Sequence, residues 1–377
     1  MLEQRLLEKA IGAAGRLIAV EPFGEGSIAR FTVDAGEHAG DWFVDSSRQP
    51  VARETGFLIR SRDGVPVARI WKHPLDPRLP ALRTALDPER LARISRAAGS
   101  EGEIEARVLA YRPGRRAVVR LTQHGTHVFV KVVRPGEAED LAEIHRACRE
   151  AGVPAPEVVH WTPAGVVVVR DATGTPGPVA ASRLPTGELL DAVDDLREHL
   201  LSVRTRRIAR ASVGSRVDWH LDRLAADLPE RGADVRALLP ALVPHLRRVG
   251  PPRVVHGDLH IGQLFFDGGR VSSVIDVDTA GLGDAADDAA AFVGHAIASS
   301  VRNEVAGRSA DAALLQGIAD EAADRWLHDP HAASLTALHL IGHGIRAADR
   351  SPEAAAMLLD RATGLAGARV TRRAATR

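Results

Sequence analysis

The chain has 377 residues, and its 49 basic and 49 acidic side chains give a formal net charge of +0 at neutral pH. This balance argues against nucleic acid or an anionic membrane as a partner, and an aromatic content of only 4% argues against base stacking. Hydrophobic residues make up 45% of the chain, enough for a sizeable core, and the length predicts two or three domains or lobes.

The single cysteine, Cys148, excludes an intramolecular disulfide framework. It falls in a predicted helix, where we expect a buried and inert thiol. No apolar run approaches the roughly 18 residues of a membrane span, and residues 1–16 are charged and amphipathic, unlike a signal peptide. We therefore expect a cytoplasmic protein in a reducing, ATP-containing compartment. The sequence carries no signal for an oligomeric state.

Residues 1–100 are predicted to form a separate N-terminal α/β cap. Its predicted elements are a helix over 2–15, strands over 29–34, 54–61 and 66–71, a proline-rich connector over 73–80, and a helix over 88–98 that Asp87 caps. The run Ser100-Glu101-Gly102 marks the boundary with the next segment.

Residues 101–172 are predicted to form a small nucleotide-binding lobe. The predicted elements are strands over 103–111, 116–122, 128–133, 157–161 and 165–170, and a helix over 138–151 that ends at Gly152. Five strands and one helix in this order are typical of the small lobe of a kinase.

Lys131 is the most informative side chain of this segment. The chain has only three lysines, and Lys131 alone stands in a strongly apolar strand. A kinase needs one lysine on this strand to contact the nucleotide phosphates and to pair with a helix glutamate. Glu139 and Glu143 share a helix face, and we favour Glu143 as that partner. The alternatives are that Lys131 points to solvent and that Glu143 is a solvated acid on the helix surface.

Two further positions of this lobe are candidates for nucleotide contact. The turn over 112–116 lies where a kinase has its phosphate-covering loop, although Gly114 is its only glycine. Its backbone amides and its arginines, Arg115 among them, are candidates for phosphate contact, and a plain surface turn is the alternative. Around Arg170 and Ala172 the chain is similar to a kinase hinge, whose backbone bonds adenine.

Residues 173–377 are predicted to form a large, mostly helical catalytic and substrate-binding lobe. The predicted helices cover 187–205, 216–228, 234–249, 286–299, 310–328 and 332–348. Trp219 and Trp326 are candidates for stacking on a sugar ring, and nearby acids are candidates for hydrogen bonds to it. A core or surface position is the alternative for each.

The strongest motif lies in the large lobe, in the run 254–266 and the following run 274–278. It indicates a strand, a polar loop, a hairpin and a strand, with acids at both loop ends. In kinases, H-R-D-x-x-x-x-N carries the catalytic aspartate and a metal-binding amide. His256, Asp258 and Gln263 keep these spacings, with glycine for arginine and glutamine for asparagine, and Asp276 follows the hairpin.

These residue types suit phosphoryl transfer. We expect Asp258 to accept the proton of the attacking hydroxyl or to orient that hydroxyl. Mg²⁺ prefers oxygen ligands, so the amide oxygen of Gln263 and the carboxylate of Asp276 are its expected ligands. The hairpin around residues 267–270 is expected to bring all three side chains to one edge.

Two alternatives to this interpretation are open. The first is an ordinary hairpin with solvated acids, and the second is a zinc site of His256, Asp258 and His260. Downstream, Asp284 and Asp287 or Asp288 are expected to begin the next helix, and one of them to bond the catalytic loop. Asp278 is expected to approach the metal or to support Asp276.

On these residues, the segment 103–350 resembles the aminoglycoside phosphotransferase-like kinases. The run from His256 to Gln263 is similar to that of bacterial maltokinases and glucosamine kinases, which also carry an N-terminal cap. The resemblance implies an α+β, bilobal, protein-kinase-like fold with a small antiparallel-sheet lobe and a large helical lobe. It also implies ATP- and Mg²⁺-dependent phosphorylation of a hydroxyl on a sugar or amino sugar. The run 278–281 departs from the maltokinase pattern and favours an amino sugar over maltose.

Two other functions are weighed against this one. An aminoglycoside or other antibiotic phosphotransferase should have a broad acidic cleft, and the acids within 191–198 and 320–324 permit one. A non-catalytic nucleotide-binding regulatory module is disfavoured, because Lys131, Asp258 and Asp276 are all present.

Overall fold

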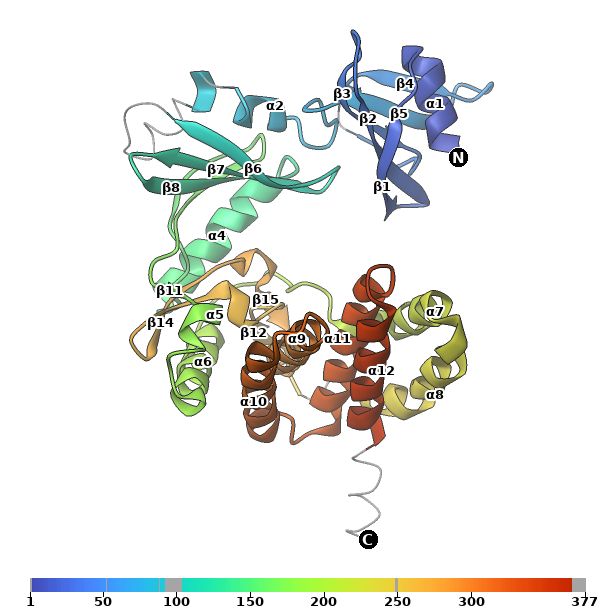
Figure 1. The fold of residues 1–377 in the computed structure, drawn as a ribbon. Helices are drawn as coiled ribbons and strands as arrows, with labels where there is room; N and C mark the ends of the chain where they lie inside the picture. The colour runs from blue at the N-terminus through green and yellow to red at the C-terminus, as the bar shows by residue number, and fades with distance from the viewer. Residues whose placement is uncertain (1, 52, 88, 92–103, 248–249, 368–377) are drawn as a thin grey trace. The chain divides into compact units, whose positions relative to one another are not determined.

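The computed structural model describes residues 2–51, 53–87, 89–91, 104–247 and 250–367 (Figure 1). It divides into two compact units. The first comprises Met1–Glu143 and Glu157–Asp171, and the second comprises Ile144–Pro156 and Ala172–Arg377. Among the described helices, none has the length and apolarity that a membrane-spanning segment requires.

The first unit begins with a five-stranded antiparallel sheet covered by one helix. The elements are α1 (Leu2–Ile11), β1 (Arg16–Phe23), β2 (Gly26–Val33), β3 (Gly40–Asp45), β4 (Phe57–Arg60) and β5 (Pro66–Lys72), with the strand order β1-β2-β3-β5-β4. Leu7 of α1 packs against a sheet face that carries Phe31 and Ile70, and all three side chains are fully buried. This burial anchors α1 to the sheet.

A second antiparallel sheet in the same unit corresponds to the predicted small lobe. The elements are α2 (Leu82–Ala85), β6 (Glu105–Arg112), β7 (Arg116–Gln123), β8 (Thr126–Val132), α4 (Glu137–Glu150), β9 (Val158–Thr162) and β10 (Val166–Arg170), with the strand order β6-β7-β8-β10-β9.

The valine run of β10 shows why this sheet is apolar throughout. Val166 and Val168 pack with α2 on one face, whereas Val167 and Val169 pack with α4 on the other. Because alternate residues of a strand point to opposite faces, a strand buried on both sides needs a continuous apolar run. The division between the units falls inside α4.

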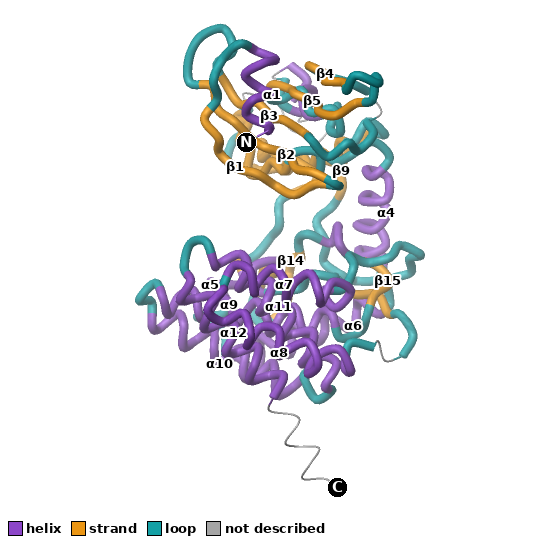
Figure 2. Tube along the Cα trace, turned by 90° about the vertical axis from the view of Figure 1, so that its right-hand side faces the viewer, coloured by secondary structure: helices purple, strands orange, loops and turns teal. Residues whose placement is uncertain are grey.

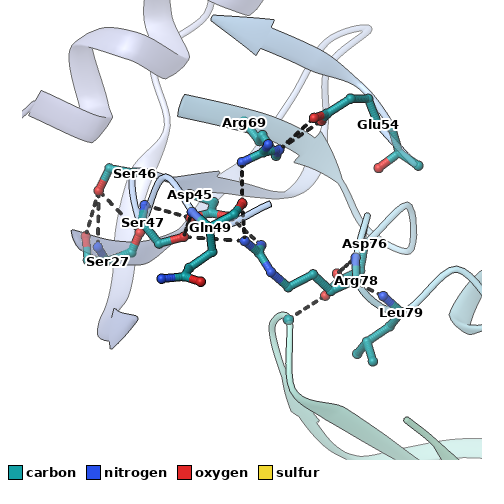
Figure 3. Close-up of polar contacts among 12 residues, drawn as sticks. Ser27, Asp45, Ser46, Ser47, Gln49, Glu54, Arg69, Asp76, Arg78 and Leu79 are labelled. Carbon is teal, nitrogen blue, oxygen red and sulfur yellow. Dashed lines mark hydrogen bonds and ion pairs between the residues drawn. The ribbon is translucent and has the colours of Figure 1, made fainter. Parts of the chain in front are cut away.

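A buried polar network connects the two sheets of the first unit (Figure 3). The Asp76 carboxylate, 1% exposed, accepts hydrogen bonds from the Tyr111 hydroxyl at 2.8 Å and from the Gly114 backbone N–H at 2.7 Å. Next to it, Arg78 forms a buried ion pair with Asp45 of β3. Buried charges require partners of this kind, so the connector 73–80 is an ordered part of the unit.

The second unit is mostly helical (Figure 2). Its helices are α5 (Gly177–Ala180), α6 (Thr186–Leu201), α7 (Val217–Asp227), α8 (Gly232–Leu242), α9 (Asp287–Val305), α10 (Ser309–Trp326), α11 (Pro330–Ala348) and α12 (Pro352–Gly367). Its strands are β11 (Thr175–Pro176), β12 (Arg253–Val255), β13 (Leu264–Asp267), β14 (Arg270–Val274) and β15 (Gly281–Gly283). Strands β11, β13 and β14 form one sheet, and β12 pairs with β15.

The predicted elements of the small lobe and of the catalytic hairpin are confirmed within a few residues. Strands β1 and β3 and helix α12 were not predicted. The predicted helix over 88–98 lies mostly outside the described residues. Cys148 is buried, as expected, and burial raises the pKa of its thiol to about 12.

Candidate active site

The loop between β12 and β13 is held by a carboxylate from α9. Asp288, 3% exposed, accepts hydrogen bonds from the backbone N–H groups of His256 and Gly257 at 2.8 and 2.9 Å. On the other side of the loop, the Thr279 hydroxyl donates to the His256 carbonyl at 2.8 Å. The expectation that one acid at the start of this helix bonds the loop is therefore confirmed, and that acid is Asp288.

His256 and Gly257 have structural roles in this loop. The His256 ring is fully buried, and its Nε2 donates to the Ile275 carbonyl at 3.0 Å, which ties the loop to the end of β14. Gly257 has a φ of 82°, and a Cβ here would lie 2.8 Å from the Thr279 carbonyl oxygen. A side chain is excluded by both conditions, which explains glycine where kinases have arginine.

Asp258 follows this glycine and is bound by basic groups. Arg210 Nη1 donates to Asp258 Oδ2 at 2.8 Å, and His295 Nε2 lies 3.7 Å from Oδ1. Burial raises the pKa of Asp258, but the adjacent His295 and the charge of Arg210 outweigh burial and hold this pKa well below its ordinary value. Asp258 is therefore an ionised acceptor at any working pH.

Gln263 and Asp276 lie at the same end of the β13–β14 hairpin. The Ile275 N–H donates to the Gln263 carbonyl at 2.9 Å, and Leu264 pairs with Val274 in the next register position. Asp276 has a φ of 59°, a left-handed conformation that aspartate tolerates better than most residues. The register thus places Gln263 opposite Ile275, the residue before Asp276, at the base of the hairpin.

The Gln263 side chain fits a role as a metal ligand. It is 4% exposed, and its Oε1 accepts no hydrogen bond from any described residue. A buried carbonyl oxygen without a donor is unfavourable unless a ligand or ion satisfies it. An amide oxygen beside a carboxylate is a donor set that suits Mg²⁺, which keeps its other positions for water and phosphate oxygens.

Histidines from three elements pack beside Asp258. The ring of His260 stacks on that of His295 in α9, with centroids 4.3 Å apart, and His343 of α11 meets His295 edge-on at 4.4 Å. Burial lowers the pKa of His260 to about 4, that of His339 to about 3 and that of His343 to about 2, with His295 contributing in each case. These three rings are neutral near pH 7.

A cavity of about 240 Å³ opens beside Asp258 within the second unit. Its lining residues come from the segment before α7, from α7, α9 and α11, and from the loop between β12 and β13: Arg210, Ala211, Ser212, Val213, Arg216, His220, Gly257, Asp258, Asp287, His295, His339, Gly342, His343 and Arg346. The side chain predicted to be the catalytic base therefore faces a space that can hold a small molecule.

Lys131 and Glu143 lie in the first unit. Lys131 is half-buried in β8, opposite Val167 of β10, and cross-strand partners share a sheet face. Since Val167 packs with α4, Lys131 lies on the face that α4 covers. Glu143 is an exposed residue of that helix.

The turn between β6 and β7 is engaged by the N-terminal part of the same unit. The Gly114 N–H, expected to be available for phosphate, donates to Asp76. The Arg115 guanidinium lies over the Phe23 ring, 5.1 Å from its centroid, and donates to the Pro22 carbonyl at 3.3 Å. These groups therefore hold the turn against β1 and the connector.

The predicted hinge lies at the division between the units, which separates Asp171 from Ala172. The backbone N–H of Arg170 donates to the Glu157 carbonyl at 2.9 Å, and its side chain forms an ion pair with the Glu157 carboxylate. Ala172 is half-buried.

The remaining candidates have distinct surroundings. Trp326 packs edge-on against Phe292, and its Nε1 donates to Asp194, whereas Trp219 is 52% exposed. Asp278 Oδ1 lies 3.2 Å from His145 Nε2. Within the described parts of the chain, no group of three or more His, Cys, Asp or Glu side chains converges to hold a metal ion, so the zinc alternative has no support.

Several residues of this site were not predicted, namely Arg210, His295, His339 and His343. His339 and His343 lie four residues apart in α11 and so share a face, which was a usable sequence signal. Arg210 stands in an irregular segment 48 residues before Asp258, and no local pattern marks it.

Comparisons with known proteins identify the family and the fold of the chain. The sequence model of a phosphotransferase enzyme family matches residues 110–328, which is more than half of the chain. A comparison with curated proteins returned no match.

The solved structures that are similar to the chain include three of aminoglycoside phosphotransferase APH(4)-Ia. The apo form of a thermostable mutant has 15% identity and a TM-score of 0.51, and covers 72% of this chain and 97% of that one. A ternary complex with AMP-PNP and hygromycin B has 13% identity and a TM-score of 0.50, with 72% and 97% covered. A third structure has 14% identity and a TM-score of 0.50, with 74% and 96% covered. Together they confirm the predicted α+β, protein-kinase-like fold.

Proposed function

Because the chain belongs to the phosphotransferase enzyme family, we propose that it transfers the terminal phosphoryl group of ATP to a hydroxyl of a small sugar-like molecule. The observation that carries this proposal is the position of Asp258, an ionised carboxylate that faces a cavity of about 240 Å³. This volume is below the roughly 300–1,000 Å³ of pockets for drug-sized ligands, so it suits a molecule of about one sugar ring.

In this mechanism Asp258 accepts a hydrogen bond from the acceptor hydroxyl and orients its oxygen toward the phosphoryl group. Arg210 and His295 hold the carboxylate in one position. The low pKa of Asp258 favours orientation over early proton removal, which suits a loose transition state in which the hydroxyl needs little activation.

Gln263 and Asp276 are the residues that would hold Mg²⁺. Bound there, the ion would neutralise phosphate charge and orient the nucleotide. The buried Oε1 of Gln263, which accepts no hydrogen bond from the described residues, supports this assignment.

In the first unit, we propose Lys131 as the phosphate contact and Glu143 as its partner, with the backbone around Arg170 and Ala172 bonding adenine. We assign Arg115 to the phosphate-covering turn. The segment 1–100 is proposed as a cap, 101–172 as the nucleotide-binding lobe and 173–377 as the catalytic lobe. These assignments extend the kinase pattern to the matching positions of this chain.

The sugar assignment rests on the similarity of the loop 256–263 to that of maltokinases and glucosamine kinases. An aminoglycoside is the second candidate acceptor, since APH(4)-Ia was solved with hygromycin B. The charges of the cavity do not favour it, because the side chains that line the cavity include three arginines and only two acids.

The test is ADP release by the purified protein with Mg²⁺-ATP and single acceptors: free sugars, amino sugars, sugar acids, aminoglycosides and amino alcohols. Stimulation by a sugar-like acceptor, abolished in Asp258→Asn, is the expected result. A protein that binds ATP but gives no stimulation with any acceptor would instead be a nucleotide-binding regulatory module.

A further inference from the structure

The cavity beside Asp258 has more positive than negative charge. The charge of Arg210 is balanced, because Arg210 forms an ion pair with Asp258. Arg216 and Arg346 also line the cavity, and neither forms an ion pair with any described residue. Two guanidinium groups at one small cavity therefore have no carboxylate of their own in the described structure, although each presents several donors suited to a carboxylate or a phosphate.

The acids of the cavity do not offset these two arginines. Apart from Asp258, the lining carboxylate is Asp287, which accepts a hydrogen bond from the Ser212 hydroxyl at 2.6 Å. Burial and the nearby Asp284 raise the pKa of Asp287 to about 6, so even this charge is partly neutralised just below neutral pH. A ligand with several ammonium groups would meet no free carboxylate among these lining residues.

The histidines supply neutral hydrogen-bonding groups. His220 Nδ1 donates to the Arg216 carbonyl at 2.8 Å, so its neutral ring presents Nε2 as an acceptor. His339 and His343 project from α11 into the same cavity and are neutral near pH 7. Uncharged imidazoles that can donate or accept are suited to the hydroxyl groups of a polyol.

We propose that the acceptor is a small polyhydroxylated anion, a sugar acid or a sugar phosphate. Arg216 and Arg346 bind its anionic group, and Asp258 receives the hydroxyl that is phosphorylated. This inference rests on the proposed function and narrows its substrate class. It disfavours both a polycationic aminoglycoside and a free amino sugar, because an ammonium group in this cavity faces two guanidinium groups.

The test compares acceptors of similar size that differ in charge. Glucose, glucosamine, glucuronate, gluconate and glucose 6-phosphate are assayed for ADP release alongside a polycationic aminoglycoside. We expect kcat/KM to be at least about tenfold higher for one of the anions than for glucose or glucosamine. Comparing glucuronate and gluconate with glucose 6-phosphate then shows whether the preferred anionic group is a carboxylate or a phosphate. Added salt should raise the KM for the anion, since charge attraction is screened.

Two variants assign the effect to the cavity. Arg216→Gln and Arg346→Gln should each raise the KM for the anionic acceptor about tenfold and leave its kcat, and the KM for ATP, within about twofold. Arg236→Gln is the matched control, because Arg236 is an exposed arginine of α8 that does not line the cavity. It should behave as the unmodified protein.

A binding measurement makes the result independent of turnover. Gluconate and glucose 6-phosphate should raise the thermal melting temperature of the unmodified protein and of Arg236→Gln, and this shift should be absent in the Arg216→Gln, Arg346→Gln double variant.

Preferential turnover of a neutral or cationic acceptor would overturn the anionic class and leave the phosphotransferase assignment intact. Absence of anion binding in the melting assay would also overturn the anionic class, whether or not ADP release is seen. Turnover of no acceptor, with anion binding retained, would overturn the phosphotransferase assignment instead.

Discussion

Arg210 donates a hydrogen bond of 2.8 Å to Asp258, and this ion pair joins an irregular segment of the second unit to the loop between β12 and β13. It leaves Asp258 Oδ1 on the side of His295 and fixes the direction of the carboxylate. A carboxylate held this way is preorganised for the proposed reaction, because it would need no reorientation to accept a hydrogen bond from the acceptor hydroxyl.

The first prediction concerns this carboxylate. Asp258→Asn should lower kcat by about 10²–10⁴-fold, because an amide neither accepts a proton nor carries the charge that orients the hydroxyl. ATP affinity should change little, since the nucleotide contacts are assigned elsewhere. Steady-state ADP release and a fluorescent nucleotide titration would measure the two quantities. Full activity in this variant would refute the catalytic assignment.

The second prediction concerns Gln263 and Asp276, the proposed ligands of Mg²⁺. Gln263→Ala and Asp276→Asn should each raise the Mg²⁺ concentration needed for half-maximal nucleotide binding by about tenfold or more, because each removes an oxygen ligand or its charge. Nucleotide affinity measured across a Mg²⁺ series is the readout. Gln263→Glu, which keeps an oxygen at the same place, is the control and should retain most of the affinity.

The third prediction concerns the support of the loop. Asp288→Ala leaves the His256 and Gly257 N–H groups without their acceptor, which should cost about 3–5 kcal/mol of unfolding free energy. Urea unfolding measures this cost. Asp360→Ala is the control, since Asp360 is 63% exposed and pairs only at the surface with Arg231, and its change should stay within about 1 kcal/mol. Equal stabilities of the two variants would contradict the role given to Asp288.

The fourth prediction concerns the first unit. Asp76→Ala should destabilise it by about 2–5 kcal/mol, because the Tyr111 hydroxyl and the Gly114 N–H lose a buried acceptor. Tyr111→Phe removes only one donor and should cost about 1 kcal/mol. The fluorescence of the fully buried Trp71 during urea unfolding, in a background whose other tryptophans are replaced by phenylalanine, reports on this unit.

The fifth prediction concerns pH. Burial, with Asp284 nearby, raises the pKa of Asp287 to about 6, against 3.8 for an ordinary aspartate. Between these two values the folded state binds more protons than the unfolded state, so the unfolding free energy falls as pH rises through this window. The loss is on the order of 3 kcal/mol.

Asp287→Asn should remove this pH dependence and still accept the hydrogen bond from Ser212. Urea unfolding at pH 4.5 and pH 7.5 should therefore show a smaller decline for the variant than for the unmodified protein. Parallel pH dependence in both proteins would show that Asp287 does not titrate in this window.

The elements that sequence reasoning missed have identifiable causes. Strand β1 is mostly exposed, so it lacks the alternation that marks a half-buried strand. In β3 the run Trp42-Phe43-Val44 is buried on both faces, so it shows no alternation of apolar and polar residues. An apolar run this short does not by itself predict a strand. The apolar stripe of α12 is built largely from alanine, which contrasts weakly with its neighbours.

The sequence by itself determined the parts of this protein whose signals are local. The spacing of His256, Asp258, Gln263 and Asp276 specifies a loop and a hairpin, because a two-residue strand period and a short turn leave their relative positions little freedom. The valine run of β10 likewise required a sheet covered on both faces.

Only the tertiary structure decided which charged side chains line the cavity. Arg210, Arg216, His295 and Arg346 come from separate segments, and each alone is typical of an ordinary helix or loop residue. They meet because apolar faces of α7, α9 and α11 pack into one core, and that packing depends on contacts between residues far apart in the chain. The spacing of the motif therefore singled out Asp258 as the proposed base, whereas the charge of its surroundings was decided by the tertiary structure.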